Sequence, residues 1–280
     1  MTRKIQQLSI KRLTSLEGHP PFLITTNHML QPLSDLRSNT TVLTSYIDHS
    51  ILHPTATDKD LEEGCKIAIK YGTATVCVKP YMVERAVELL ARSSVSVCTV
   101  VGFPHGSNTT DIKVIETIEA CRNGASEIDM VINIGKVIEG DWDYIEVEIG
   151  QVMDVALGHN KRIKVIFEND FLKDEHKIKL CEICSALHVA FVKTSTGFGF
   201  VKQKDGKFAA PGATLSDLRL MRQQCSPTVE IKAAGGIRSL DDMIAAIEAG
   251  ASRIGTSATV AILEESKGMK NSSTEQKEDY

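Results

Sequence analysis

Short apolar runs alternate along residues 45–265 with longer segments in which apolar residues recur at every third or fourth position. The short runs are rich in valine and isoleucine and lack strict alternation with polar residues, which is typical of parallel strands buried on both faces. The longer segments have the spacing of amphipathic helices, as at Leu61, Cys65 and Ala68. The expected strands begin near residues 45, 73, 95, 126, 162, 189, 228 and 251.

Eight such strand and helix units predict an α/β fold, a (β/α)8 TIM barrel, over residues 45–265. An open doubly wound sheet is the alternative, but nothing in the sequence marks an edge strand or a reversal of strand order. Several predicted helices begin with a capping signature, in which a polar residue precedes an aspartate by three positions. These signatures are Thr57–Asp60, Asn108–Asp111, Thr214–Asp217 and Ser239–Asp242.

Three segments lie outside the regular pattern. Residues 1–44 predict an N-terminal extension, and residues 1–16 contain four basic residues and no acid. We expect a helix packed on or near the barrel there, with a weak organellar presequence as the alternative. Residues 201–213 are polar and predict a long loop that acts as a lid beside the site. Residues 266–280 predict a polar, mobile tail.

Composition narrows the class of protein. The chain has 280 residues, a net charge of −4 and 5% aromatic residues, which argues against nucleic-acid binding. No apolar run reaches the roughly 18 residues that a membrane span needs. The seven cysteines are an odd number, and no secretory signal is evident, so we expect a reducing, cytoplasmic location. The Cys181-x-x-Cys184 motif lies in a helical pattern and predicts helix packing.

The end of the sixth predicted strand carries the first candidate for chemistry. Apolar residues 189–192 are followed by Lys193 and then by a loop of hydroxyl residues and glycines. Burial disfavours the ammonium form of a lysine, and a neutral amine attacks carbonyls to form a Schiff base. A lysine that reaches solvent at a strand end is the structural alternative.

The seventh predicted strand repeats this arrangement with Lys232 at its end and a Gly-Gly turn after it. In a parallel barrel both lysines point into the same mouth. Two ammonium groups about 5 Å apart repel by roughly 3 kcal/mol at an effective dielectric constant of about 20. This repulsion is a second, independent reason for one lysine to be neutral.

Two aspartates also lie in strands whose carboxyl ends meet at this mouth. Asp129 lies between apolar neighbours, and a buried carboxylate is costly unless it is paired. Opposite the two lysines it is placed to transfer protons, directly or through a water molecule. A structural ion pair with Lys232 alone is the alternative. Asp48 has similar surroundings and is expected to order water or bind a substrate hydroxyl.

Glycine-rich turns after three successive barrel strands predict a phosphate site built from backbone N–H groups. Arg238 is the expected charge partner and Ser257 a hydroxyl donor, although glycine also simply permits tight turns. The glycines concerned are Gly197, Gly199, Gly235, Gly236 and Gly255. The histidines show no HxH or HxxxH pattern and most strand-end carboxylates are single, so we predict no metal and no cofactor.

The segment from residue 46 to residue 257 resembles the deoxyribose-phosphate aldolase family, class I aldolases that need no metal and have a TIM-barrel fold. The motifs that carry this resemblance are EIDMVINIG (127–135), IKVIFEND (163–170), FVKTSTGFG (191–199), IKAAGGIR (231–238) and RIGTS (253–257). The resemblance implies reversible cleavage of 2-deoxy-D-ribose 5-phosphate to D-glyceraldehyde 3-phosphate and acetaldehyde. Barrels of this kind often form homodimers.

The resemblance also implies a role for individual residues. Lys193 matches the Schiff-base lysine, Lys232 the second lysine that favours its neutral form, and Asp129 the proton-relay acid. The substrate contacts that it implies are Asp48 and Cys77 in the pocket, with Thr194 beside the lysine, and Gly197, Gly235, Gly236, Arg238, Gly255 and Ser257 around the phosphate.

Departures from the family pattern bear on substrate breadth rather than on the reaction. Ala258 stands where a serine is common, which removes a hydroxyl from the phosphate site, and the 201–213 loop is longer than usual. Tyr280 ends the polar tail, and in the family such a tyrosine reaches into the site. The alternatives are a Schiff-base aldolase for another sugar phosphate and a barrel that binds a sugar phosphate without catalysis.

Overall fold

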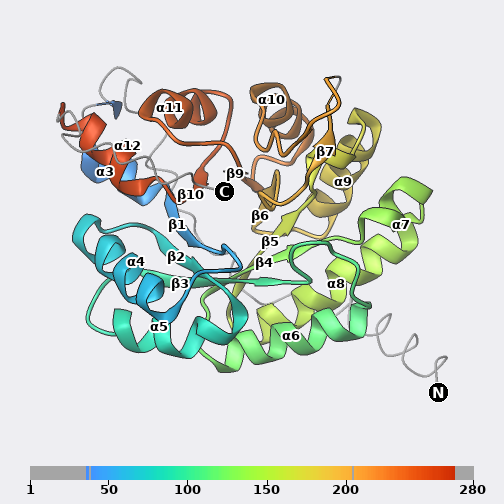
Figure 1. Ribbon diagram of the computed structural model, residues 1–280. Coiled ribbons are helices and arrows are strands. Elements are labelled where there is room, and N and C mark those ends of the chain that lie inside the picture. The colour runs from blue at the N-terminus through green and yellow to red at the C-terminus, as the bar shows by residue number, and fades with distance from the viewer. Residues whose placement is uncertain (1–35, 38, 204, 269–280) are drawn as a thin grey trace. The chain divides into compact units, whose positions relative to one another are not determined.

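The computed structural model describes residues 36–37, 39–203 and 205–268, all of which belong to one unit, Leu33–Tyr280. Within this part of the chain, eight parallel strands close into a barrel in the order β1-β10-β9-β6-β5-β4-β3-β2 (Figure 1). The predicted (β/α)8 barrel is therefore confirmed. The strands are β1 (Ile47–Ile51), β2 (Thr75–Val78), β3 (Ser96–Val101), β4 (Glu127–Val131), β5 (Arg162–Ile166), β6 (Phe191–Lys193), β9 (Glu230–Ala234) and β10 (Arg253–Thr256).

Helices cover the outside of the barrel and bury its apolar residues (Figure 1). The main helices are α4 (Asp58–Tyr71), α5 (Val83–Leu90), α6 (Thr110–Arg122), α8 (Trp142–Gly158), α9 (Asp174–Ala186), α10 (Leu215–Gln224), α11 (Leu240–Glu248) and α12 (Thr259–Ser266). Shorter helical elements include α3 (Thr40–Ser45), α7 (Ile134–Glu139) and the 3₁₀ helices Pro80–Met82 and Asn169–Phe171. No helix among the described residues is long and apolar enough to cross a membrane.

Helix starts follow the predicted caps with one exception. Thr57 and Ser239 form full capping boxes, and the Thr214 side chain accepts a hydrogen bond from the Asp217 N–H. The Asn108–Asp111 signature is wrong, because Thr109 is the residue that precedes α6 and its side chain makes no capping bond. The Asn108 amide instead donates to the Glu116 side chain within α6.

Two predicted segments contain structure that the pattern did not indicate. The fourth strand was expected over 126–135, but β4 ends at Val131 and the Asn133 side chain caps the start of α7. The expected long loop at 201–213 contains a small antiparallel hairpin of β7 (Val201–Lys202) and β8 (Phe208–Ala209). Of the predicted N-terminal extension, α3 contacts α12 through a hydrogen bond between Thr40 Oγ1 and Ser266 Oγ of 2.9 Å. The predicted mobile tail lies outside the described residues from 269 onward.

A buried ion pair joins α6 to α8 outside the barrel. Lys113 Nζ lies 2.7 Å from Glu148 Oε1 and donates to the Val131 carbonyl at 2.8 Å, and both side chains are fully buried. The other carboxylate oxygen of Glu148 accepts the Asn133 N–H at 2.9 Å. Removing one partner of a buried pair leaves an unpaired charge, which is far more costly than removing both.

We therefore expect Lys113→Met to lower the free energy of unfolding by about 3–5 kcal/mol. The double variant Lys113→Met/Glu148→Gln should recover part of this loss, because it leaves no buried charge. Urea unfolding of both variants and of the wild type measures the difference. A double variant that is no more stable than Lys113→Met would show that the unpaired carboxylate is not the cause.

Candidate active site

The register of the barrel brings the two predicted lysines together. Lys193 ends β6 and pairs directly with Lys232 of β9. Their ammonium nitrogens lie 2.9 Å and 2.8 Å, respectively, from one atom, Asp129 Oδ2. All three side chains are at most 2% exposed. The barrel therefore places Lys193, Lys232 and Asp129 in mutual contact, as the strand-end argument requires.

Asp129 has a third lysine partner that sequence reasoning missed. Lys164 of β5 lies directly opposite Asp129 in the barrel register, and its Nζ is 2.8 Å from Asp129 Oδ1. The same nitrogen is 2.6 Å from Glu127 Oε2. The sequence did carry a signal for a buried cation here. Glu127 and Asp129 are two residues apart on one strand, so their carboxylates face the same side. The alternative of an ion pair with Lys232 alone is wrong.

Asp48 lies deeper in the same network. Its Oδ2 is 2.6 Å from Lys232 Nζ, and its Oδ1 accepts from Arg253 at 2.7 Å. Arg253 also contacts Glu127, at 3.0 Å, so it links both carboxylates. Asp48 is fully buried and held by cations. Its expected role in contacting substrate remains a prediction, and the structure gives it the further role of holding Lys232.

The charges in this network do not balance. Four buried cations (Lys164, Lys193, Lys232 and Arg253) face three buried carboxylates (Asp48, Glu127 and Asp129). An unpaired charge away from water is costly. Lys193 contacts one of these carboxylates, whereas Lys232 contacts two and Lys164 three. Lys193 is therefore the lysine of the network with the fewest carboxylate contacts.

The pKa shifts in the network follow from these contacts. Burial raises the pKa of Asp129, but Lys164, Lys193 and Lys232 outweigh it and hold that pKa well below the ordinary value of 3.8. The pKa of Asp48 is lowered in the same way, against burial, by Arg253, Lys232 and Lys164. Burial lowers the pKa of Lys232, but Asp129 and Asp48 outweigh it, so the net shift is upward. Lys232 is accordingly a permanent cation at neutral pH.

The depressed carboxylate pKa values predict a loss of stability in acid. A carboxyl group whose pKa is lower in the folded state stabilises the fold above its unfolded pKa, and this contribution disappears as the pH falls through the folded pKa. For Asp48, Glu127 and Asp129 the decline begins near their ordinary values, 3.8 for aspartate and 4.5 for glutamate. Each contributes on the order of 2 kcal/mol.

Urea unfolding between about pH 6 and about pH 2.5 measures this decline. Glu148 and Glu168 act in the opposite direction, because burial raises the pKa of each. The variant Glu127→Gln removes one of the three contributions and should flatten the curve. A wild-type curve that is level down to pH 3 would contradict the ion-pair account.

The loop after β6 is fixed by a buried glutamate and by a link to β9. Glu168 accepts hydrogen bonds from the N–H and the hydroxyl of Thr196, and its own backbone is left-handed, with φ 57°. A Cβ at Gly199 would lie 2.8 Å from the Glu168 carboxyl carbon, so a larger residue there would displace this carboxylate. Thr194 is fully buried and its hydroxyl donates to the Ala234 carbonyl at 3.0 Å, which joins the ends of β6 and β9.

The predicted phosphate residues lie at the ends of three neighbouring strands, β6, β9 and β10. Gly197, Gly236, Arg238 and Ser257 are exposed there, while Gly235 and Gly255 are partly covered. Gly235 has φ +90° and a Cβ at this position would lie 2.9 Å from Gly212 Cα, so only glycine fits. Ala258 precedes α12 without a side-chain capping bond. The adjacency of these turns is what a backbone phosphate cradle needs.

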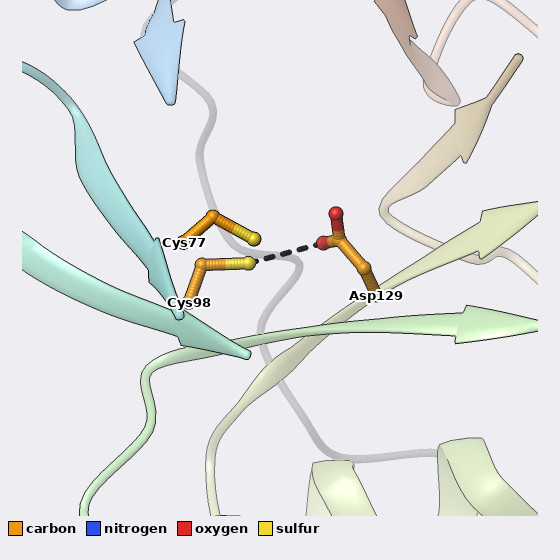
Figure 2. A group of neighbouring side chains, drawn as sticks. All are labelled: Cys77, Cys98 and Asp129. Carbon is orange, nitrogen blue, oxygen red and sulfur yellow. Dashed lines mark hydrogen bonds between the residues drawn. The ribbon is translucent and has the colours of Figure 1, made fainter. Parts of the chain in front are cut away.

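Cys77 faces the barrel interior from β2 and lies beside Cys98 of β3 (Figure 2). Cys98 donates to Asp129 Oδ1 at 3.1 Å, a contact that sequence reasoning missed. A cavity of about 310 Å³ adjoins this pair, with Leu52, Val100 and Phe103 in its wall. The cysteine pair therefore lies between these apolar side chains and Asp129. Tyr280 lies outside the described residues.

The comparisons by family model, by sequence and by structure all find aldolases similar to this chain. Residues 42–265 match the model of a family described as DeoC/LacD family aldolase. Proteins named deoxyribose-phosphate aldolase from Rhodopirellula baltica and Caldanaerobacter subterraneus subsp. tengcongensis are 47% and 48% identical, over 79% of this chain and 88% and 92% of theirs. A tetrameric deoxyribose phosphate aldolase from Aeropyrum pernix has a similar structure, with a TM-score of 0.73 and 27% identity over 82% of this chain and 95% of that one.

Proposed function

Because the chain belongs to the DeoC/LacD family of aldolases, we propose that it is a deoxyribose-phosphate aldolase that cleaves 2-deoxy-D-ribose 5-phosphate to D-glyceraldehyde 3-phosphate and acetaldehyde. The observation that carries this proposal is the contact of Lys193 and Lys232 with the same oxygen of Asp129 inside the barrel. A Schiff-base aldolase needs one neutral lysine next to a cation and an acid–base group, and two lysines that share one carboxylate oxygen are consistent with that need.

The first step is attack of the neutral Lys193 amine on the C1 aldehyde of the open-chain sugar. Loss of water gives an iminium ion, which withdraws electrons from the C2–C3 bond. That bond breaks as the C3 hydroxyl loses its proton, so glyceraldehyde 3-phosphate leaves and an enamine remains. Protonation at C2 and addition of water then release acetaldehyde and regenerate the amine.

Asp129 serves as the proton relay in this scheme, together with a water molecule. While three lysines surround it, its carboxylate binds a proton poorly. Reaction at Lys193 changes one of those three contacts, which alters the proton affinity of Asp129 at the moment when a proton must move. Lys232 stays charged and holds Asp129 Oδ2 in place.

Phosphate binding at the rim orients the sugar so that C1 reaches Lys193. We expect Arg238→Ala to raise KM for 2-deoxyribose 5-phosphate about 10- to 100-fold, because a hydrogen bond to a charged group contributes about 1.5–3 kcal/mol. KM for unphosphorylated 2-deoxyribose should change little. Steady-state kinetics with both sugars make the comparison, and an equal effect on both would remove Arg238 from the phosphate site.

Release of acetaldehyde tests the proposed function itself. Purified protein incubated with 2-deoxyribose 5-phosphate should yield acetaldehyde and glyceraldehyde 3-phosphate in equal amounts, measured by coupled dehydrogenase assays. No acetaldehyde from this substrate would overturn the proposal.

We also propose that the chain self-associates and acts in the cytoplasm. The tetrameric aldolase of similar structure supports the first point, and seven free cysteines support a reducing compartment. Light scattering should give a mass that is two or more times the 30.6 kDa of one chain. A monomer at micromolar concentration would contradict self-association.

A further inference from the structure

Two cysteines meet inside the barrel next to the Asp129 network. Cys77 of β2 and Cys98 of β3 are paired in the strand register, and each is at most 1% exposed. Both side chains point toward Asp129 (Figure 2), and their sulfur atoms lie within 4.8 Å of each other. Neighbouring strands are about 4.8 Å apart, which is inside the range of about 4.4–6.8 Å between the Cα atoms of a disulfide. The backbone therefore already permits a bond between these sulfurs.

The surroundings favour reaction with an oxidant over binding of a metal cation. Lys164 Nζ donates to Cys98 Sγ at 3.2 Å, and the carboxylate that a cation would need is held by three ammonium groups. A cation at this place would have to displace them. The same positive charges stabilise a thiolate, which is the reactive form of cysteine.

The thiol pKa values of the two cysteines shift in opposite directions, as expected of a nucleophilic thiol and the thiol that resolves it. The Cys98 thiol beside it lowers the pKa of Cys77 against the effect of burial, and Lys232 lowers it further. Burial raises the pKa of Cys98 well above the ordinary value. Leu52, Val100 and Phe103 pack against the cysteine pair and also line a cavity of about 310 Å³, so only these side chains separate the thiols from a small oxidant in that cavity.

We infer that Cys77 and Cys98 form a modification site, a dithiol that a peroxide converts into a disulfide and thereby inactivates the enzyme. The Cys77 thiolate attacks one oxygen of the peroxide, so that an S–O bond forms, the O–O bond breaks and hydroxide leaves. The Cys98 sulfur then attacks Cys77, so that the S–S bond forms and the S–O bond breaks. With hydrogen peroxide two water molecules result, the two thiols lose two electrons, and the peroxide gains them.

Oxidation affects catalysis because Cys98 is hydrogen-bonded to Asp129, the proposed proton relay. In the disulfide Cys98 has no proton to donate to Asp129 Oδ1, and its sulfur moves toward Cys77. A displacement of about 1 Å in a site of this kind costs up to about 100-fold in rate. The part of the inference that concerns activity rests on the proposed aldolase function, whereas formation of the disulfide does not.

The test treats the full-length protein with hydrogen peroxide, blocks the remaining thiols with iodoacetamide and maps disulfides by peptide mass spectrometry. We expect a peptide that links Cys77 to Cys98, a loss of aldolase activity of at least about tenfold, and recovery of activity with dithiothreitol. Alkylated Cys77 and Cys98 after complete treatment would overturn the inference. A complete disulfide without loss of activity would overturn its effect on catalysis.

A second buried cysteine contact provides the matched control. Cys181 and Cys225 lie within hydrogen-bond reach of each other between α9 and the end of α10, away from the Asp129 network. Cys225→Ser should lose activity on oxidation as the wild type does, whereas Cys98→Ser should form no disulfide at Cys77. Untreated protein that releases no acetaldehyde would refute the proposed function, and the disulfide map would still decide the modification site.

Discussion

Replacing Lys193 by alanine is expected to lower kcat for cleavage of 2-deoxyribose 5-phosphate by about 10⁴-fold or more, since loss of a covalent nucleophile is among the largest single effects on an enzyme. The structural reason is specific to this lysine. Lys193 is the lysine of the network with the fewest carboxylate contacts, so it is the one held least firmly as a cation. Neither Lys164 nor Lys232 takes its place, because each is held by two or more carboxylates.

The matched control is Lys179→Ala. Lys179 lies exposed on α9 and pairs with Glu182 at 2.9 Å, so its removal should leave kcat unchanged. The variant Lys193→Ala should also fold, because Lys193 makes only one carboxylate contact and Asp129 keeps its contacts with Lys164 and Lys232. Retention of more than about one tenth of wild-type kcat in Lys193→Ala would contradict its role as nucleophile.

Replacing Asp129 by asparagine is expected to affect stability and rate together. The variant leaves three buried lysines around a neutral amide, so we expect a loss of about 3–5 kcal/mol in the free energy of unfolding. It also removes the proton relay, which should lower kcat by about 10³-fold. Urea unfolding and steady-state kinetics at a temperature where the variant is folded measure the two effects separately.

Glu127→Gln separates the structural effect from the chemical one. Glu127 has contacts of the same kind as Asp129, with Lys164, Arg253 and Arg162, but none of its ion pairs involves Lys193 or Lys232. We expect a comparable loss of stability with a much smaller loss of kcat. Equal losses of kcat in the two variants would show that Asp129 acts only by holding the lysines.

The regular part of the fold was predictable because the spacing of apolar residues differs between the strands and the helices. The buried strands lack alternation and the helices repeat every three to four residues, and these two patterns are enough for a (β/α)8 barrel. Helix α7 was not predictable in this way, because only two residues separate it from Val131 and it is six residues long, which is too short for a helical period to show. The β7–β8 hairpin has two residues per strand, which is too short for a period to show.

The residues proposed as nucleophile and relay acid, Lys193 and Asp129, stand out in the sequence because each is a charged residue in an apolar strand. Their partners depend on register, which no single strand reveals. Lys164 contacts Asp129 because β5 lies beside β4 with these two residues opposite each other. Cys98 contacts Asp129 across the neighbouring pair of strands, where β3 pairs with β4. The number of carboxylate contacts of each lysine, which singles out Lys193, became countable only when these partners were assembled.

The most direct test of the central claim is to trap the covalent intermediate. Purified protein is mixed with 2-deoxyribose 5-phosphate, reduced with borohydride, digested and analysed by peptide mass spectrometry. The account predicts one adduct, on Lys193, that is absent when the sugar is omitted and absent from Lys193→Ala. An adduct on Lys164 or Lys232, or release of acetaldehyde without any adduct, would contradict it.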